Sequence, residues 1–584
     1  MRTGISTLGI LTALLLVGAC FDPTRPCSTN TDCENGGTCD PGTKTCVAAG
    51  NPNDKTAPVF SIVVTPPPSR QDTTKLTEFD PGSPDAGRGA FRRDESVVVT
   101  VTSSDPDVDA SSVKLLVHGV AANPGTAVEV QLGSCGATNP AASNPFCREG
   151  TVELAPLPFE AFRAVMPLEV SGSDLSDNVG RADAGLNVTR WKWRYAAGAP
   201  IYTTPAIADD GTIVFGTSDG GSGALYALLA DGSEKWAPVA LEPIKASPTL
   251  GTADGGQQLT YVGTAGANGR LVAIDVRDGS LSSVCPTSGG YGGPIVGTPA
   301  LVKSGPQSFE GALGVANGAK MVNIRPTASA ADGICLVSDV TITQAYPSSV
   351  VAQVSDAFVG TAEGAVRAYK VLSGNWVANT TWGGGLGYSP VGNAPVQLSF
   401  LASAVVGTTS LRGVFSLEQD TGVLQGSSPD GGVEADPGGV IVFGGEYLFG
   451  GGIAPSPALY SSPLSLGTAA RIPISEALVG TPVAGLGGLA YFATAGGSLE
   501  SRSSASTHNW SGFLGGGESF AGSPTIGCGP QGSASGVLFV GSTSGNLFAV
   551  IVDSAGLDPS SPWPKYQHDL RNTGNPATPI QSCP

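Results

Sequence analysis

The sequence predicts an all-β protein of several units, the last of which is built from repeats. The chain has 584 residues, which is too long for one ordinary core. Gly (83) and Pro (45) are abundant and charged residues make up only 13%, which favours short strands joined by many turns. Between residues 191 and 575, a pattern of prolines and short apolar runs recurs eight times. Such self-similarity is typical of architectures in which small sheets stack on one another.

Residues 1–19 have the features of a secretory signal peptide. Arg2 precedes an apolar stretch that is short for a membrane-spanning helix, and small residues stand before Cys20. The ending Val-Gly-Ala-Cys resembles the lipobox of bacterial lipoproteins, which implies that Cys20 becomes the lipidated first residue after cleavage. We therefore expect a lipid anchor in the bacterial cell envelope, most simply at the outer membrane. The alternative is an ordinary signal peptide with Cys20 merely nearby.

Cysteine usage also indicates export. The chain has eleven cysteines, and if Cys20 is acylated the remaining ten can all pair in an oxidising compartment. Residues 20–48 are too few to bury a useful core, so disulfides are the expected substitute. The stretch CENGGTC resembles the middle of an EGF-like module, but the closely spaced final pair of that family is absent. Three connectivities stay open, and we favour Cys27 with Cys39 and Cys33 with Cys46. The module is either a small binding unit or a stapled spacer.

Residues 56–190 are predicted to form a β-sandwich. After a polar linker, β-rich runs alternate with turn-rich segments such as PPPSRQDTT, which suggests an immunoglobulin-like arrangement. Cys135 and Cys147 would close one loop of it. Asp105, Asp107 and Asp109 invite a calcium interpretation, but an EF-hand loop needs Gly and Glu where this chain has Ala and Leu. We expect a solvated turn there and no metal ligand.

The repeat runs over residues 191–575, and a short tail follows at 576–584. Each copy offers three or four short strands, such as IVFGT and ALYAL, which cannot bury both faces of a sheet alone. Radial stacking solves this problem in β-propellers, so the sequence predicts eight blades. The order of SP or TP, VFGT, ALYAL, Asp-Gly and Trp resembles the PQQ-like propeller repeat. The copies at Pro299 and Pro437 are weaker than the others; the prolines that mark the eight copies are Pro205, Pro248, Pro299, Pro347, Pro390, Pro437, Pro482 and Pro524.

Tryptophans mark a second position of the repeat and indicate how the ring closes. Trp193 and Trp236 precede their next proline by the same spacing, and Trp376 and Trp510 by a similar one. We assign all four to blade packing. Because the first three strands are missing before Trp193, residues 191–195 are predicted to supply the outer strand of the last blade.

Cys285 and Cys335 stand where other copies tend to have tryptophan. They either pair between neighbouring blades or lie too far apart for a disulfide. By elimination Cys528 pairs with Cys583 and ties the motif WPKYQHDLRNTG to the last blade.

The sequence predicts no enzyme and no catalytic, cofactor-binding or metal-binding residue. The net charge of −18 argues against nucleic acid as a partner. PQQ-dependent dehydrogenases use an adjacent cysteine pair, which this chain lacks. The three histidines, His118, His508 and His568, lack metal-ligand spacing, and the Gly-rich stretches lack the lysine that phosphate loops need.

We therefore expect a lipid-anchored, non-catalytic envelope protein whose propeller is a protein-binding scaffold for other envelope proteins, either as a monomer or within a hetero-complex. The chain resembles the propeller lipoprotein family of the outer-membrane barrel-assembly machinery, although the extra module and sandwich depart from that plan. The alternatives are a carbohydrate- or cell-surface-polymer-binding protein and, less favoured, a PQQ-dependent dehydrogenase.

Overall fold

The computed structural model describes most of the chain from residue 54 to 583. Before residue 54 it describes only 26–28, 38–39 and 44–47, so the predictions for residues 1–19, Cys20 and Cys33 lie outside the described residues. The described segments contain strands, one 3-10 helix, η3 (Trp382–Gly385), and no α-helix. The gaps after residue 54 are 83–88, 123–124, 145, 254–255, 304–309, 317–319, 326–333, 340–347, 354, 373–374, 386–394, 410–412, 429–437, 452–456, 531 and 584.

Near the N-terminus, β1 (Thr38–Cys39) and β2 (Cys46–Val47) pair antiparallel, with Cys39 opposite Cys46. Cys27 is disulfide-bonded. The described residues do not give the disulfide partner of Cys27, and Cys33 lies outside them, so the favoured pairs Cys27–Cys39 and Cys33–Cys46 stay predictions.

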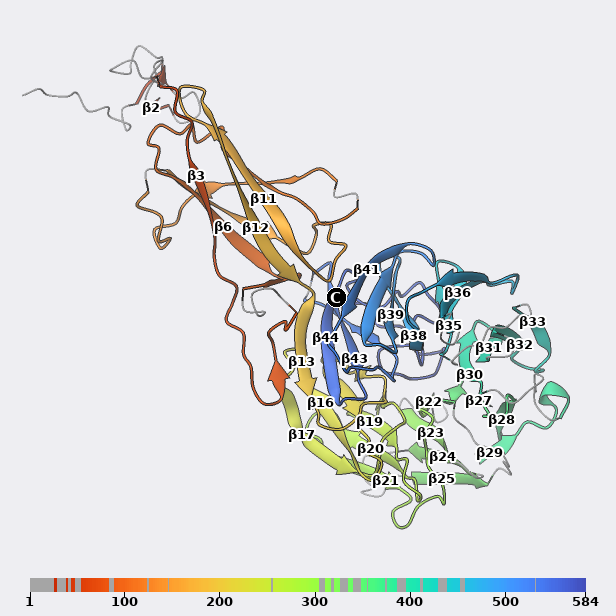
Figure 1. Cartoon of the computed structure of the whole chain (residues 1–584). Coiled ribbons are helices and arrows are strands. Elements are labelled where there is room, and N and C mark those ends of the chain that lie inside the picture. Colours follow the sequence, from red (N-terminus) through yellow and green to blue (C-terminus); the bar gives the residue numbers. More distant parts are fainter. Residues whose placement is uncertain are drawn as a thin grey trace, which may run out of the picture.

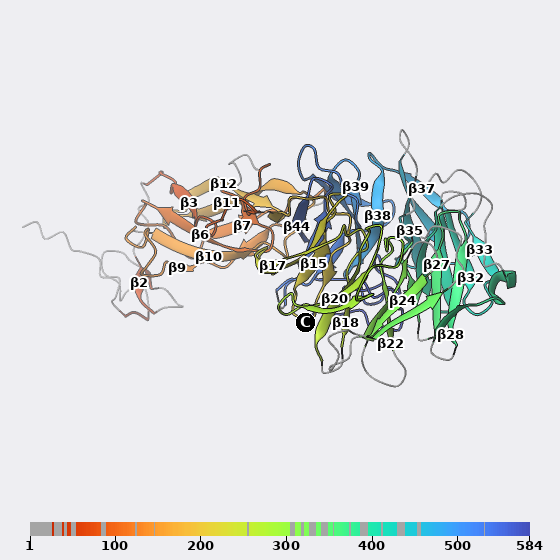
Figure 2. The same ribbon diagram turned by 90° about the horizontal axis from the view of Figure 1, so that it is seen from below.

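Two sheets within residues 60–189 share one buried apolar core. Their strand orders are β3-β6-β10-β9 and β5-β12-β11-β7-β8. Val97, Val99 and Val101 of β6 all lie in the core, because successive side chains of a strand point to opposite faces. Together the sheets form a β-sandwich, which is elongated in Figure 2. The bounds are β3 (Phe60–Val64), β5 (Phe91–Arg92), β6 (Ser96–Ser103), β7 (Lys114–Val117), β8 (Val128–Val130), β9 (Gly133–Ser134), β10 (Phe146–Glu153), β11 (Arg163–Ser173) and β12 (Val179–Thr189).

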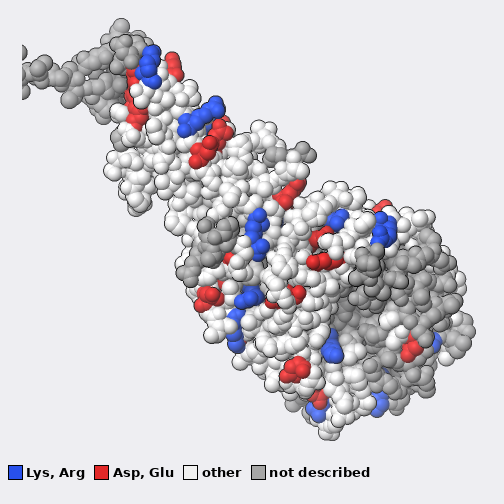
Figure 3. Space-filling view, viewed as in Figure 1, with Lys and Arg blue, Asp and Glu red and all other residues white. Residues whose placement is uncertain are grey.

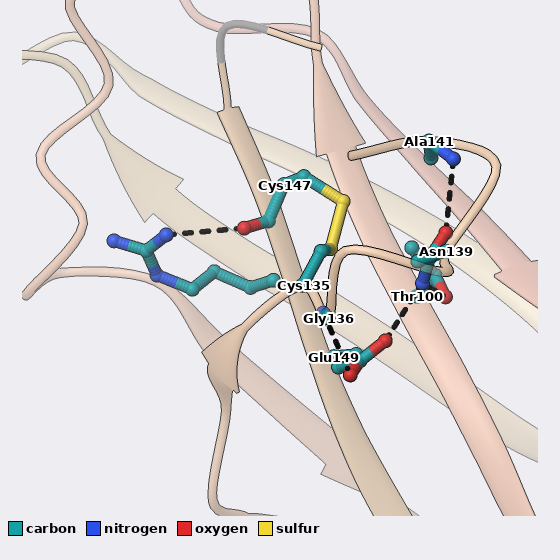
Figure 4. The surroundings of a disulfide bond; sticks show 8 residues. Thr100, Cys135, Gly136, Asn139, Ala141, Cys147 and Glu149 are labelled. Carbon is teal, nitrogen blue, oxygen red and sulfur yellow. Dashed lines mark hydrogen bonds between the residues drawn. A yellow bond between two sulfur atoms is a disulfide. The ribbon is translucent and has the colours of Figure 1, made fainter. Parts of the chain in front are cut away.

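A disulfide between Cys135 and Cys147 fastens one loop of the sandwich to β10, with a Cα–Cα distance of 5.6 Å. Figure 4 shows Glu149 beside it, where its carboxylate accepts hydrogen bonds from the Gly136 amide (3.1 Å) and the Asn139 side chain (2.7 Å). These two donors, Asn139 first, hold the pKa of Glu149 below its ordinary value. The loop is thus fixed by a covalent bond and a charged acceptor together.

The rest of the described chain forms a β-propeller. Eight sheets follow one another, and seven of them have four strands in consecutive order. Their first strands contact each other, as β14 contacts β18, β18 contacts β22 and β22 contacts β26, so these strands lie nearest the centre of the ring in Figure 1. The ring therefore has a central axis lined by the start of each repeat.

The seven four-stranded sheets have these bounds: β14 (Ala206–Ile207), β15 (Ile213–Gly216), β16 (Gly223–Leu228) and β17 (Glu234–Leu241); β18 (Thr249–Thr252), β19 (Gln258–Gly263), β20 (Leu271–Asp275) and β21 (Leu281–Cys285); β22 (Ala300–Lys303), β23 (Glu310–Ala316), β24 (Lys320–Arg325) and β25 (Ile334–Asp339); β26 (Val351–Ala352), β27 (Asp356–Gly360), β28 (Val366–Leu372) and β29 (Asn375–Ala378); β30 (Gln397–Leu401), β31 (Ala404–Thr409), β32 (Gly413–Glu418) and β33 (Leu424–Ser427); β34 (Ile441–Phe443), β35 (Glu446–Gly451), β36 (Ala458–Pro463) and β37 (Ala470–Pro473); β38 (Leu478–Gly485), β39 (Leu489–Thr494), β40 (Ser498–Arg502) and β41 (His508–Phe513).

The last sheet joins the two ends of the repeat region. β42 (Thr525–Gly527), β43 (Gly536–Gly541) and β44 (Asn546–Val552) are completed by β13 (Trp191–Ala196), which pairs antiparallel with β44. The outer strand predicted from Trp193 is therefore present.

A fifth strand of this sheet, β4 (Leu76–Thr77), pairs with β13. The predicted sandwich range 56–190 includes these two residues, but they form an edge strand of the last propeller sheet instead. A two-residue strand carries no periodic signal, and its position is set by the partner strand, so the sequence alone does not reveal it.

Candidate functional site

The centre of the propeller is filled by the chain's own C-terminal segment, residues 561–575, which we call the axial segment. Its carbonyl oxygens accept hydrogen bonds from inner-strand amides of six sheets. One segment thus connects six sheets at the axis. The bonds are Ile207 to Leu570 (2.7 Å), Leu250 to Arg571 (2.8 Å), Leu301 to Thr573 (2.7 Å), Ala352 to Gly574 (2.9 Å), Val442 to Trp563 (3.1 Å) and Ala484 to Pro564 (2.6 Å).

The Asn572 side chain connects the axial segment to two neighbouring sheets. It is fully buried, and its Nδ2 donates to the carbonyl oxygens of Thr204 (3.1 Å) and Pro248 (3.0 Å) in two neighbouring sheets. Its Oδ1 accepts a hydrogen bond from Lys565. The φ of Asn572 is 54°, a left-handed conformation that Asn adopts more readily than most residues.

Lys565 places a basic group inside the ring. Its Nζ also donates to the carbonyl oxygens of Tyr566 (2.8 Å) and Asp569 (3.0 Å). Burial lowers the pKa of Lys565 from 10.5 to about 7, although the nearby charge of Asp569 raises it in part. Burial alone raises the pKa of Asp569, but His568, Arg571 and the Thr573 amide outweigh it and lower that pKa. The axial segment therefore keeps its charges internally compensated.

The histidines predicted to have no catalytic role lie far from one another. His568 is buried in the axial segment, 5.0 Å from the Trp563 ring and 3.9 Å from an oxygen of Asp569. His118 is partly exposed beside Glu169 in the sandwich (3.4 Å), and His508 is exposed in β41. The structure does not bring these three side chains together.

Six hydroxyl side chains surround the axis, each at the same position of its repeat, three residues before the residue whose amide faces the axial segment; Gln397 and Gly439 hold this position in the other two sheets. Six of the backbone amides at this position donate to the hydroxyl of the next sheet, and the bond from Ser523 to Thr204 joins the last sheet to the first. We call these six side chains the hydroxyl ring. Its other bonds run from Thr204 to Ser247 (2.8 Å), Ser247 to Thr298 (3.0 Å), Thr298 to Ser349 (3.1 Å), Gly439 to Thr481 (3.0 Å) and Thr481 to Ser523 (2.8 Å).

The hydroxyl ring also refines the frame of the repeat. Pro347, Pro390 and Pro437 lie outside the described residues. The inner strands of these copies are β26, β30 and β34, so the equivalent positions are Ser349, Gln397 and Gly439. These three copies lack proline after the frame residue, which explains why counting prolines misplaces the start of those copies.

Tryptophans lock neighbouring sheets together. Trp193 and Trp236 donate from Nε1 to Ala230 (3.0 Å) and Val276 (3.1 Å) in the turn of the next sheet. Each ring lies on the glycine of an Asp-Gly turn, and a Cβ at Gly279 would lie 2.8 Å from Trp236 Cδ2. This contact explains the paired occurrence of Trp and Asp-Gly in the repeat.

The other two tryptophans of the frame pack differently. In the sheet of Trp376, the equivalent bond comes from Trp382, which donates to Gln419 (2.7 Å), while Trp376 is buried between strands of its own and the preceding sheet. Trp510 packs on Phe162 of the sandwich and Tyr491. Spacing alone does not identify Trp382, because the spacing of Trp376 is counted from Pro390, whereas the frame position of that copy is Gln397.

Two further disulfides lie in the propeller. Cys285 of β21 pairs with Cys335 of β25 in the neighbouring sheet, with a Cα–Cα distance of 5.5 Å, so the outer strands are close enough for a bond. Cys528 pairs with Cys583 at 5.3 Å and fastens the end of the chain beside β42.

Arg190 joins the sandwich to the propeller. Its side chain is fully buried, pairs with Asp553 (2.7 Å), and donates to the Ala161 carbonyl (2.8 Å). Its guanidinium lies 4.6 Å from the centre of the Trp510 ring. The two parts are therefore connected by a buried charge as well as by β4.

Three carboxylates lie close together at the end of the sandwich that is opposite to the propeller. Oxygens of Asp54, Asp107 and Asp174 lie within 4.8 Å of one another. The hydrogen bond with Asp105, burial and nearby negative charge raise the pKa of Asp107 to about 6. The backbone amides of Ser176 and Asn178 donate to Asp174 Oδ1 (2.8 and 2.9 Å), so its carboxylate is part of a turn. The Asp109 carboxylate also accepts a hydrogen bond within its own turn, from the Ser111 backbone amide (2.9 Å).

Within the described residues, no helix is long and apolar enough to span a membrane. Figure 3 shows charges of both signs interspersed on one face, with most of the surface formed by other residues.

Comparisons with known proteins find similarity only among solved structures. No family model matches the chain, and no curated protein does. BamB from Moraxella catarrhalis is similar over 60% of this chain and 93% of its own, with 13% identity and a TM-score of 0.43. The quinohemoprotein alcohol dehydrogenase from Comamonas testosteroni is similar over 63% of this chain and 77% of its own, with 12% identity and a TM-score of 0.43. Saccharomyces cerevisiae Sqt1 is similar over 62% of this chain and 98% of its own, with 11% identity and a TM-score of 0.47.

Proposed function

We propose that this protein is a lipid-anchored, non-catalytic component of the bacterial cell envelope whose propeller is a protein-binding scaffold. The propeller consists of eight PQQ-like blades, one for each sheet, within residues 191–575. The cysteine-rich module (20–48) and an immunoglobulin-like sandwich (56–190) separate it from an anchor at Cys20.

The observation that carries this proposal is the axial segment. Because it bonds to six sheets at the centre, the blades cannot move apart without breaking buried hydrogen bonds. A rigid disc of this kind presents its connecting loops in fixed positions, and loops held by a rigid scaffold are well suited to recognition.

The residues at the axis do not fit a quinone cofactor there. Trp563, Lys565 and Asn572 fill the space between the inner strands and are themselves buried. The described cysteines of the propeller lie in disulfides at its outer strands and at the end of the chain. We therefore infer that the residues at the axis stabilise the propeller and do not carry out redox chemistry.

The scaffold function is tested by cross-linking the full chain in intact cells, capturing it and identifying its partners by mass spectrometry. We expect one or more envelope proteins, and we expect the purified partner to bind the purified chain at a fixed stoichiometry. If no protein binds while an array of surface glycans gives a specific signal, the polymer-binding alternative replaces this proposal.

The anchor is tested with Cys20→Ser. This variant should lose incorporated fatty acid and leave the membrane fraction, while its partner binding is unchanged. Equal membrane association of both proteins would contradict lipidation at Cys20.

The absence of catalysis is tested by adding PQQ and Ca²⁺ to the full chain. A bound-quinone absorption band together with dye reduction would refute the non-catalytic assignment.

A further inference from the structure

A polar pocket lies on the axis next to the hydroxyl ring. Its volume is about 180 Å³, and it is lined by hydroxyls of the ring, Tyr566, Gln397 and Lys245. Drug-sized ligands usually occupy roughly 300 to 1,000 Å³. This axial pocket is therefore of a size for a small ion.

Three hydroxyls of the ring have a hydrogen left to donate to a group in this pocket. Thr204, Thr481 and Ser523 each accept a backbone amide from a neighbouring sheet. A hydroxyl has one hydrogen to donate besides its acceptor pairs. Among the described residues, no acceptor is found for the hydroxyl hydrogens of these three side chains. Three buried donors thus converge on the pocket from three sheets.

Tyr566 forms the side of the pocket nearest the axial segment. Its hydroxyl is within 2.8 Å of Thr298 Oγ1 and also bonds to Ser349. Burial raises the pKa of Tyr566, so the phenol keeps its proton and adds no negative charge.

Two further donors face the pocket without a protein acceptor. Gln397 replaces a hydroxyl residue of the ring, and its Nε2 is buried with no partner among the described residues. Lys245 lies at the mouth, with Nζ 5.8 Å from the centre of the Tyr202 ring. Of the ion pairs in the described part of the chain, none involves Lys245.

The charge of the lining has the opposite sign to that of the whole chain. The net charge of the protein is −18, yet the described lining contains Lys245 and no Asp or Glu. An unpaired donor in a buried position costs free energy until an acceptor reaches it. An ion with several acceptor oxygens and a negative charge satisfies all of these groups at once.

We propose that the axial pocket binds a small tetrahedral oxyanion, free phosphate or sulfate, through the hydroxyls of Thr204, Thr481 and Ser523, the Gln397 amide and the Lys245 ammonium. This site is independent of the proposed scaffold function, and either can fail without the other.

The test is isothermal titration of the purified full chain with sodium phosphate or sodium sulfate at constant ionic strength, with sodium chloride and glucose as comparisons. We expect saturable binding of phosphate, sulfate or both. Lys245→Gln should weaken it at least tenfold, because it removes the one lining cation while altering an exposed side chain that the fold does not need. Gln397→Glu should abolish it, since a carboxylate replaces an amide of the same shape.

Lys114→Gln is the matched control, because Lys114 is an exposed lysine of the sandwich paired with Glu129. It should bind as the unaltered chain does. Thermal unfolding of each variant shows whether it is folded. If Gln397→Glu does not fold, the binding measured for Lys245→Gln decides the test alone. The proposal is overturned if neither ion binds saturably, if Lys245→Gln and Gln397→Glu bind like the unaltered chain, or if glucose binds and both oxyanions do not.

Discussion

Replacing Asn572 by alanine tests the axial segment most sharply. The substitution leaves the buried carbonyls of Thr204 and Pro248 without their donor and removes one acceptor of Lys565. Each carbonyl left without its donor costs about 1 kcal/mol, and the acceptor lost by the Lys565 ammonium costs about 1.5 kcal/mol, so the stability of the axial segment falls by about 3.5 kcal/mol. Alanine at a φ of 54° adds about 1 kcal/mol. We expect a local destabilisation of about 4.5 kcal/mol.

The assay is hydrogen exchange followed by mass spectrometry on the full chain. Peptides that contain the amides of Ile207 and Leu250 report directly, because these amides donate to the axial segment. A loss of about 4.5 kcal/mol should accelerate exchange through local opening about a thousandfold, since about 1.4 kcal/mol corresponds to a factor of ten.

Two comparison variants sharpen this prediction. Asn572→Gly loses the same hydrogen bonds without the backbone penalty, so it should be about 1 kcal/mol less damaging. Asn375→Ala changes an exposed asparagine of β29 and should leave exchange unchanged. Exchange at Ile207 and Leu250 that stays within tenfold of the unaltered chain in Asn572→Ala would refute the reasoning.

Three other predictions follow from buried groups. Arg190→Met should cost about 3 kcal/mol, because it removes one of the two arginines that pair with Asp553, Arg93 remaining at 3.6 Å, and leaves the Ala161 carbonyl without its donor. Scanning calorimetry should then show the sandwich and propeller unfolding separately; an unchanged thermogram contradicts this. Burial lowers the pKa of Lys565 from 10.5 to about 7, so between these pH values the unfolded chain binds more protons and stability rises with pH. Denaturant midpoints at pH 7 and 9.5 should show this rise in the unaltered chain and a smaller rise in Lys565→Met, whereas equal rises would count against it. Cys528→Ser opens a loop with a sequence separation of 55, which should cost about 2–4 kcal/mol and expose the segment before Cys583 to proteases; resistance equal to that of the unaltered chain would show that the bond is dispensable.

The sequence predicts the β-propeller because its signals are local and repeated. Apolar runs, Asp-Gly turns and Trp193 each depend on a few adjacent residues, and eight copies make a weak pattern clear. The pairing of β13 with β44 follows from counting strands, since the first copy begins with an outer strand that lacks its own sheet.

The features that the sequence analysis missed depend on contacts between distant segments. For the axial segment, the sequence predicts only that the Cys528–Cys583 bond fastens it to the last sheet. Nothing in WPKYQHDLRNTG shows that its carbonyl oxygens accept hydrogen bonds from six sheets. The hydroxyl ring was missed because a Ser or Thr before proline has many local uses, and its role is visible only when the ring closes from Ser523 to Thr204.

The central claim is that the chain's own C-terminal segment occupies the axis of the propeller. Hydrogen exchange of the peptide spanning residues 563–575 in the unaltered full chain measures this directly. The structure predicts protection as strong as that of β43 and β44, because the segment is buried, amides such as those of Asn572 and Gly574 donate within it, and its carbonyl oxygens hold it to six sheets. Exchange of this peptide at the rate of an unprotected chain, while β43 and β44 stay protected, would contradict the claim.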